Sequence, residues 1–209
     1  MNTPIDARQY APATLRNREP ILEVLLRVLP SDGNILEIAS GTGEHAIFFA
    51  PHLSPRQWIP SDCNPVLLTS IQAWREYSPV DNLHPPLAIN VQDEVWSIEA
   101  KDLSIAAIAN INMIHISPWS ACLGLMAGAN RLLPSGGILY LYGPFKRGGK
   151  HTAPSNLAFD ESLRAQNPEW GVRNLEDVIE VANNQGLNLL EIVQMPANNL
   201  SVVFQREIV

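Results

Sequence analysis

The stretch Asn34-Ile35-Leu36-Glu37-Ile38-Ala39-Ser40-Gly41-Thr42-Gly43-Glu44-His45-Ala46 decides the fold of this chain. Its mostly apolar first half, 34–40, predicts a short buried strand, and the segment 44–53 predicts a helix. Gly41 and Gly43 allow a tight turn between the two and leave bare backbone for a ligand to approach. A strand, a glycine turn and a helix in this order indicate an α/β sheet, whose ligands bind at the carboxyl ends of the strands.

Outward from this unit, apolar runs alternate with helix-like segments along the whole chain. The other expected strands are 57–60, 87–91, 103–111, 138–142, 188–194 and 200–205. The other expected helices are 19–29, 65–77, 120–132, 160–165 and 175–184. The connection between the last two strands is so short that it permits only an antiparallel hairpin. The pattern predicts a doubly wound, mostly parallel seven-stranded sheet with helices on both faces and a C-terminal antiparallel hairpin.

Two segments stand outside this rhythm. Residues 143–174 are rich in glycine, proline, basic and aromatic residues, and loops of this length in compact domains usually carry function. We expect this insertion to cover a substrate pocket. We expect residues 1–20 to form an N-terminal lid segment, and residues 1–209 to form a single domain.

The composition excludes several classes of protein. The 209 residues are 46% hydrophobic and 17% charged, with a formal net charge of −7. This hydrophobic content excludes a disordered chain, and the acidic balance argues against binding to nucleic acid, which needs a basic face. No apolar run is long enough to span a membrane, no secretory signal is visible, and the two cysteines suit free thiols in a reducing cytosol. We therefore expect a cytoplasmic monomer or homodimer that acts on a small molecule.

Three carboxylates accompany the carboxyl ends of the first three expected strands. Glu37 lies inside the first strand, Asp62 ends the second strand 21 residues after Gly41, and Asp93 lies near the end of the third. The place and spacing of Asp62 are those of a carboxylate that binds ribose hydroxyls. Asp62 also suits a helix cap and Asp93 a solvated loop, so a structural role stays open for both.

Two classes of ligand compete for the glycine turn. Gly41, Gly43 and Ala46 satisfy the loose dinucleotide pattern G-x-G-x-x-G/A, which allows an NAD(P)-dependent or flavin-dependent oxidoreductase. Glu37 and Glu44 would repel a pyrophosphate, whereas they would attract the cationic ammonium and sulfonium of S-adenosylmethionine. The acids therefore favour the sulfonium cofactor. An oxidoreductase and a non-catalytic cofactor-binding protein remain the alternatives.

The residues of this turn resemble motif I of class I S-adenosylmethionine-dependent methyltransferases. The stretches 60–65 (PSDCNP) and 112–115 (NMIH) resemble their second-strand motif and the motif after their fourth strand. A closer resemblance links residues 16–22, 114–119, 142–145 and 155–164 to the family registered as domain of unknown function 938, which includes the animal methyltransferase-like protein 26. Motif I usually has glycine where this chain has Ala39, and the extra methyl group is tolerable unless the position needs a positive φ.

The resemblance implies roles for individual residues toward S-adenosylmethionine. The backbone of the turn would cradle the aminocarboxypropyl arm, Asp62 would accept the ribose hydroxyls, and Asp93 would mark the adenine. Asn112 would line the pocket near the sulfonium, and Arg18 or Asn17 would close the carboxylate end. The implied cofactor-binding residues are Arg18, Glu37, Ala39, Ser40, Gly41, Gly43, Asp62, Asp93 and Asn112.

Methyl transfer from a sulfonium is an in-line displacement that depends mainly on the placement of donor and acceptor, so no metal is expected. A general base is needed only if the acceptor carries a proton that must leave. His115 is the first candidate because histidine titrates near neutral pH. Tyr142 is the second candidate catalytic residue. A hydrogen-bonded core histidine is the structural alternative. Three aromatic residues are expected to bind the acceptor or else to fill the core: Trp119, Phe145 and Trp170.

Overall fold

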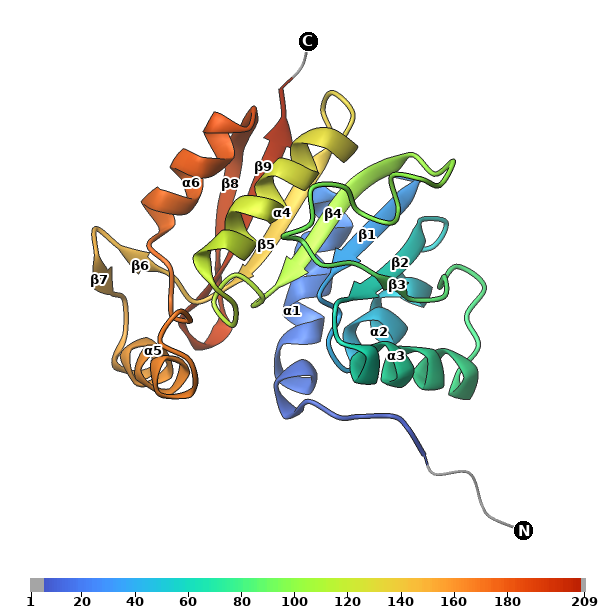
Figure 1. Ribbon diagram of the computed structural model, residues 1–209, viewed down its shortest axis with the longest axis horizontal. Coiled ribbons are helices and arrows are strands. Elements are labelled where there is room, and N and C mark those ends of the chain that lie inside the picture. The colour runs from blue at the N-terminus through green and yellow to red at the C-terminus, as the bar shows by residue number, and fades with distance from the viewer. Residues whose placement is uncertain (1–5, 208–209) are drawn as a thin grey trace.

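Seven strands form one sheet in the order β3-β2-β1-β4-β5-β9-β8 (Figure 1). The computed structural model describes residues 6–207. The strands of this sheet are β1 (Asn34–Ile38), β2 (Gln57–Asp62), β3 (Leu87–Ala88), β4 (Ile105–Ile111), β5 (Ile138–Gly143), β8 (Leu187–Met195) and β9 (Asn199–Arg206). Only β9 runs against its neighbours β5 and β8, while the other neighbouring pairs are parallel. The predicted doubly wound, mostly parallel sheet with a C-terminal antiparallel hairpin is confirmed.

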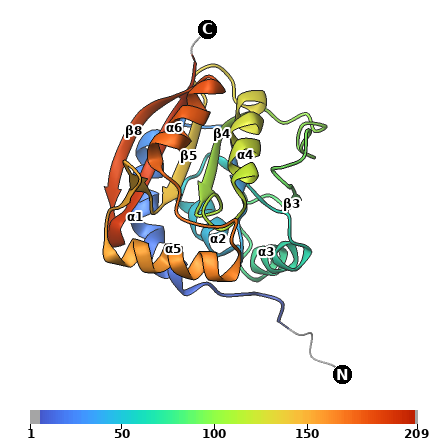
Figure 2. The same cartoon turned by 60° about the vertical axis from the view of Figure 1, so that its left-hand side comes forward.

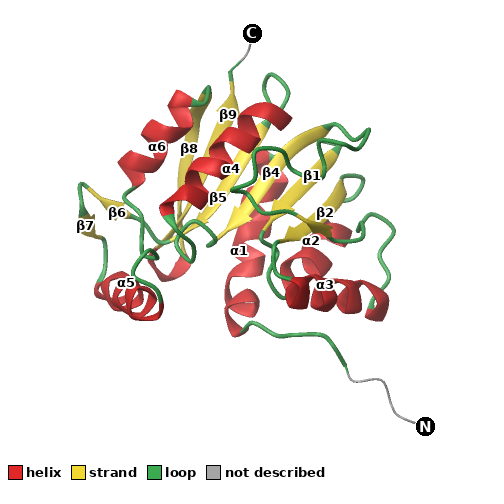
Figure 3. Ribbon diagram, viewed as in Figure 1, coloured by secondary structure: helices red, strands yellow, loops and turns green. Residues whose placement is uncertain are grey.

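Helices cover both faces of this sheet (Figure 3). They are α1 (Pro12–Val28), α2 (Glu44–His52), α3 (Pro65–Tyr77), α4 (Trp119–Leu132), α5 (Pro154–Gln166) and α6 (Leu175–Asn184), with a 3₁₀ turn at Pro196–Asn198. Residues of α1 and α2 pack with Trp58 and Tyr140 on one face, and residues of α4 and α6 pack with Trp96 and Leu139 on the other. The central strands read as nearly continuous apolar runs because both of their faces are buried.

None of the helices in the described range 6–207 has the length and apolar character needed to cross a bilayer. Cys63 is exposed and Cys122 is buried, and both are free thiols. The compartment and the oligomeric state stay predictions.

The largest departure from the expected boundaries is at the start of α1. The sequence pattern places the helix start at 19, with Pro20 in the first turn, but α1 begins at Pro12 and contains Pro20 in its interior. Proline is preferred in the first turn of a helix, and Pro12 meets that preference as well as Pro20 does. Residues 12–20 of the predicted lid segment are therefore the first half of a long helix. The bounds of α3 and α6, by contrast, are those predicted.

The insertion 143–174 contains a small hairpin, formed by β6 (Lys146–Arg147) and β7 (Lys150–His151), followed by α5. The Asp160 carboxylate on α5 is buried and joins these parts together. Its partners, at 2.7–3.3 Å, are Lys146, His151, Arg164 and the backbone N–H of Val172. A buried carboxylate with this many donors fixes the hairpin to α5 and to the chain that leads into α6. Figure 2 shows α5 lying across the lower end of the sheet.

Candidate functional site

The glycine turn lies at the carboxyl end of β1, where the chain order in the sheet reverses between β1 and β4. Open α/β sheets bind their ligands in the crevice at such a point. The turn has an unusual backbone, because Ala39, Gly41 and Gly43 all have a positive φ, of 57°, 58° and 93°. The Ser40 N–H donates to the Ser61 carbonyl at 2.7 Å, which fixes the turn to the end of β2.

Ala39 stands in the left-handed region of backbone space, which an alanine enters only with strain. The position thus needs the positive φ that makes glycine the usual residue of the motif. The sequence pattern identifies the departure from glycine but not this strain, since φ at one residue depends on how the whole turn closes.

Replacing Ala39 with glycine should therefore raise the free energy of unfolding by about 0.5–1 kcal/mol. The strain energy that is relieved exceeds the entropic cost of the more flexible unfolded chain. Urea unfolding measures the change. Ala73→Gly, within the ordinary helix α3, is the matched control and should destabilise by about 1 kcal/mol. A loss of stability in Ala39→Gly would show that the turn carries no such strain.

Asp62 ends β2 beside the glycine turn, as the sequence predicts. Its side chain is buried, and its Oδ2 accepts the backbone N–H of Gly41 at 3.0 Å. Its Oδ1 accepts the N–H of Asn64 at 2.9 Å, just before α3. A carboxylate offers about four acceptor positions, so these two bonds leave room for two more donors. Asp62 therefore combines the structural role with the capacity to hold a diol.

Glu37 lies deeper than the turn and is almost fully buried. The Trp58 indole N–H donates to its Oε2 at 3.1 Å. Burial raises the pKa of this carboxyl to about 7, and the charge of Asp62 adds to the rise, while hydrogen bonds from Ser40 and Trp58 oppose it. Glu37 thus lies beneath the surface of the crevice, and its carboxyl is mostly ionised only above neutral pH.

The amino end of α2 already holds a carboxylate. Glu44 is the first residue of the helix, and its Oε2 accepts the Thr42 hydroxyl at 3.0 Å and the backbone N–H of Ala11. In dinucleotide-binding proteins the pyrophosphate occupies this position, where the helix dipole favours an anion. Glu44 therefore places a negative charge of the protein itself at the start of this helix.

Two asparagines mark the end of β4. Asn110 is almost fully buried and donates its amide to the Ile38 carbonyl at 3.0 Å, while its Oδ1 has no partner within the described part of the chain. Asn112 follows the strand with a φ of 64° and donates its N–H to the Tyr142 carbonyl at 2.8 Å. Asn110 is not among the residues predicted from the sequence, although a polar residue inside an apolar strand is a signal for a buried polar contact.

Asp93 lies farther from its strand than expected, because β3 ends at Ala88. It is exposed in a turn and accepts the Asn90 side-chain amide at 3.3 Å. Burial raises the pKa of the Cys63 thiol, and the charges of Asp62 and Asp93 raise it further, so both acids lie near Cys63. The solvated-loop alternative describes the position of Asp93, and an adenine contact remains a prediction.

A cavity of about 590 Å³ opens beside Asn112 at the carboxyl edge of the sheet. It is lined by α1, the residue after β4, the end of β5 and the residue that follows it, the first turns of α5 and the turn before β9, which are far apart in the sequence. The lining residues are Ala13, Arg16, Asn17, Asn112, Tyr142, Pro144, Ser155, Asn156, Phe159, Pro196, Ala197, Asn198 and Asn199.

Arg16 rather than Arg18 reaches this cavity. Ala13, Arg16 and Asn17 have the spacing that places residues on one face of a helix. The Arg18 guanidinium instead lies 4.4 Å from the centre of the Phe48 ring, on the side of α2. Arg16 is not among the predicted site residues, because the expected helix begins after it.

Tyr142 is buried at the wall of the cavity, where Asn17 connects it to α2. Burial raises the pKa of its hydroxyl, and a hydrogen bond from Asn17 opposes the rise. Asn17 Oδ1 lies 2.8 Å from His45 Nε2, and burial together with the charge of Arg18 lowers the pKa of His45 to about 4. His45 is then neutral and donates to Asn17, which donates to Tyr142. The Tyr142 hydroxyl is therefore better suited to donating a hydrogen bond to a ligand than to acting as a general base.

His115 and Phe145 lie in the core rather than at the cavity. Both are almost fully buried, and their rings meet edge to face with centroids 4.9 Å apart. His115 Nδ1 accepts the Arg173 N–H at 3.2 Å, and burial, with the charge of Arg173, lowers the pKa of the imidazole to about 3. His115 is a poor general base in this position, because it binds a proton only in strong acid. The core-histidine alternative describes it.

Trp119 and Trp170 are half-buried and are absent from the lining of the cavity. Trp119 begins α4, and the Arg173 guanidinium lies 5.6 Å from its ring centre. Arg173 also donates to the carbonyls of Ile114 and Ser117, so it ties the turn after β4 to the insertion. These contacts fit the core-filling alternative for Trp119 better than an acceptor-binding role.

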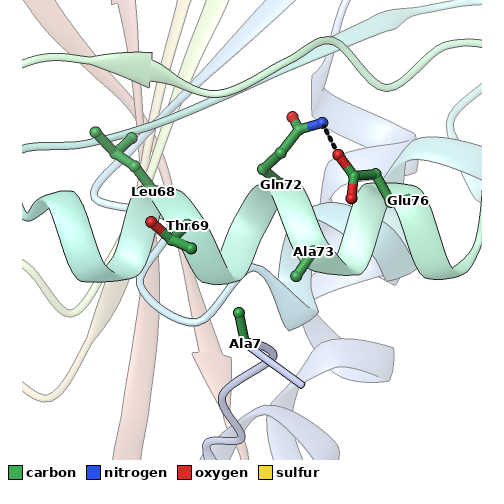
Figure 4. Close-up of a pocket in the computed structure, with 6 residues that line it drawn as sticks. All are labelled: Ala7, Leu68, Thr69, Gln72, Ala73 and Glu76. Carbon is green, nitrogen blue, oxygen red and sulfur yellow. Dashed lines mark hydrogen bonds between the residues drawn. The ribbon is translucent and has the colours of Figure 1, made fainter. Parts of the chain in front are cut away.

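A second hollow, of about 460 Å³, lies on the surface between Ala7 and one face of α3 (Figure 4). Near it, the Gln9 N–H donates to the Ser70 hydroxyl, which donates in turn to the Thr42 carbonyl in the glycine turn. The N-terminal segment is thus hydrogen-bonded through Ser70 of α3 to the turn, and its role as a lid stays a prediction. Residues 1–5 of the predicted lid lie outside the described residues.

The comparisons with known proteins agree with this geometry. A family model described as protein of unknown function, DUF938, matches residues 8–206. An O-methyltransferase family protein from Burkholderia thailandensis has a similar structure, with a TM-score of 0.77 and 12% identity over 94% of this chain and 58% of that chain. The S-adenosylmethionine-dependent methyltransferase SibL in its apo form has a TM-score of 0.74 and 14% identity, over 93% of this chain and 56% of that chain.

CalO1, a methyltransferase of calicheamicin biosynthesis in its SAH-bound form, gives a TM-score of 0.70 and 14% identity, over 92% of this chain and 54% of that chain. This chain therefore spans less than two thirds of the length of each of these three proteins. At such identities the likeness shows the fold alone, which is the Rossmann-like α/β fold of these methyltransferases.

Proposed function

This chain belongs to the family described as protein of unknown function, DUF938, and from that premise we propose that it transfers a methyl group from S-adenosylmethionine to a small molecule. The observation that carries the proposal is the contact between Asp62 and Gly41 at the crevice between β1 and β4. It places a carboxylate with free acceptor positions beside bare turn backbone. The methyltransferase fold of the structural neighbours supports the same reading.

The charges around the crevice support a cationic ligand over a dinucleotide. Glu37 lies beneath the turn and Glu44 occupies the amino end of α2. The orphaned Oδ1 of Asn110 lacks a donor, and an ammonium or another N–H group would supply one, whereas a phosphate would not. Asp62, the turn backbone and Asn112 are the residues that would hold S-adenosylmethionine.

When bound, S-adenosylmethionine supplies a methyl group on a cationic sulfur. The chain's own contribution is to bind and orient the two reactants, which is where much of the acceleration of such a displacement arises. The Tyr142 hydroxyl and the asparagine amides around the cavity hold the acceptor beside Asn112. The ordinary neutral-pH bases, His, Asp and Glu, are absent from the lining residues of this described cavity. An acceptor that arrives as an anion needs none.

Isothermal titration of the purified protein with S-adenosylmethionine, S-adenosylhomocysteine and NADH tests the proposal. We expect both sulfur ligands to bind and NADH not to bind. Binding of NADH alone would favour the oxidoreductase, and binding of none of the three would overturn the proposed function.

Turnover needs a separate measurement. With the labelled methyl group of S-adenosylmethionine and a small-molecule extract, we expect label to appear in a new product. A protein that binds S-adenosylhomocysteine but transfers no label to any fraction of the extract would be a cofactor-binding protein without catalysis.

A further inference from the structure

Resting on the proposed function, we propose that the cavity beside Asn112 is the acceptor site and that it selects a small carboxylate that also carries hydroxyl groups. Arg16 would bind the carboxylate, and amide oxygens of the wall would accept the hydroxyls. Three features of the lining lead to this class of molecule: its charge, its free hydrogen-bonding atoms and its apolar part.

The charge of the lining is positive. Arg16 is the only charged residue of the lining, its side chain is exposed at the cavity's edge, and it has no ion-pair or hydrogen-bond partner among the described residues. Lys146 and Arg164, by contrast, are each paired with Asp160. An unpaired guanidinium on a cavity wall without carboxylates favours an anion, and its planar fork matches a carboxylate.

The first turn of α5 adds to this positive field. Ser155 of α5 lines the cavity, and α5 begins at a proline with no side-chain cap, whereas at the start of α1 the Glu44 carboxylate already accepts the Ala11 N–H. Free backbone N–H groups at a helix start favour negative charge. The field therefore has the same sign as Arg16.

The free hydrogen-bonding atoms of the wall are mainly acceptors. Asn156 is almost fully buried, and its amide N–H groups donate to the Asn198 carbonyl and the Thr152 hydroxyl, both at 3.0 Å. Asn199 donates to the Pro196 carbonyl at 3.1 Å. Because each of these amides has a carbonyl among its acceptors, its orientation is fixed and the Oδ1 atoms remain for a ligand. Such acceptors pair with hydroxyl groups, and the Tyr142 hydroxyl supplies a donor.

The remaining lining is apolar. Phe159, Pro144 and Pro196 contribute side chains without hydrogen-bonding atoms, and a flat ring buries its faces well against such groups. A hydroxylated aromatic carboxylate meets all three features, and its carboxylate oxygen, already an anion, would form the new bond to the methyl carbon as the methyl–sulfur bond breaks, so that no proton has to be removed. The inference thereby names the class of acceptor that the proposed function leaves open.

Titration of the protein saturated with S-adenosylhomocysteine tests the inference with three matched probes: 3,4-dihydroxybenzoate, 3,4-dihydroxybenzamide and 3,4-dihydroxybenzylamine. We expect affinity to fall in that order. Arg16→Gln should weaken the binding of the carboxylate probe about 10-fold and leave the affinity for the amide probe unchanged. Arg16→Glu should weaken the binding of the carboxylate probe further. Arg147→Gln is the control, because Arg147 is exposed on the β6–β7 hairpin outside the cavity.

The same titration separates the two proposals. Tighter binding of the amine, equal binding of all three probes, or no binding of the carboxylate would overturn the inference while S-adenosylhomocysteine still binds. If S-adenosylhomocysteine fails to bind but the carboxylate binds through Arg16, the proposed function falls and the anion-selective cavity stands.

Discussion

Replacing Asp62 with alanine is expected to weaken the binding of S-adenosylhomocysteine by at least about 100-fold, because hydrogen bonds to a charged carboxylate are worth about 1.5–3 kcal/mol each and a ribose diol makes two. The substitution also releases the Gly41 N–H, which Asp62 holds at 3.0 Å. The turn would then lose part of its shape as well as its acceptor. Isothermal titration measures the change.

Two further variants make this result decisive. Asp62→Asn keeps the shape of the side chain but faces the N–H groups of Gly41 and Asn64 with one acceptor instead of two, so we expect weakened binding from it too. Asp81→Ala removes an exposed carboxylate near the other end of β2 and should leave affinity unchanged. If Asp62→Ala is folded by circular dichroism and binds with unchanged affinity, Asp62 serves only as the cap of the turn.

The sequence predicts the glycine turn and the strands beside it well because this part of the fold is built locally. A strand, two glycines and a helix follow one another within residues 34–53, and Asp62 comes next at the end of the neighbouring strand. Periodicity and turn chemistry act over such distances. The helix Pro65–Tyr77 is predicted to the residue for the same reason, since Asn64 caps it and a proline opens it.

The cavity beside Asn112 is predicted poorly because no local signal describes it. Arg16, Asn156 and Asn199 come from three distant parts of the chain and meet only after folding. The aromatic residues expected there pack elsewhere, since Phe145 gains more from burial against His115 than from exposure on a wall. A sequence pattern identifies residue types suited to binding, but the direction of each side chain depends on the packed fold.

His115 shows the same limit for catalysis. Histidine titrates near neutral pH in water, and that property made it a candidate base. Burial under the insertion lowers its pKa to about 3, so the folded protein has removed the property on which the prediction relied. The cavity has no replacement among its described lining residues, which agrees with an acceptor that arrives already deprotonated.

Glu37→Gln is expected to stabilise the protein by about 3 kcal/mol at pH 8 and to leave stability nearly unchanged at pH 4. The pKa of Glu37 is raised from 4.5 to about 7 in the folded protein, mainly by burial. Its contribution to stability is therefore fully present below pH 4.5 and is lost as the pH rises through 7, since the unfolded chain then releases the proton more readily. A rise of about 2.5 pKa units corresponds to about 3 kcal/mol.

Glutamine has the shape of the neutral acid and keeps an acceptor for the Trp58 indole, so it lacks the cost of a buried negative charge. Urea unfolding of variant and wild type at pH 4, 6 and 8 gives the difference at each pH, and the contributions of His115 and His45 cancel in it. Glu94→Gln, on an exposed side chain, is the control and should show no such dependence. A Glu37→Gln protein that is less stable than wild type at pH 8 would mean that the charge is held by a favourable partner.

The gain in stability at pH 8 should be accompanied by weaker binding of the cationic S-adenosylmethionine, because a neutral amide beneath the turn no longer attracts it. A variant more stable than wild type and weaker in binding would identify Glu37 as a residue whose buried charge lowers stability in favour of the ligand.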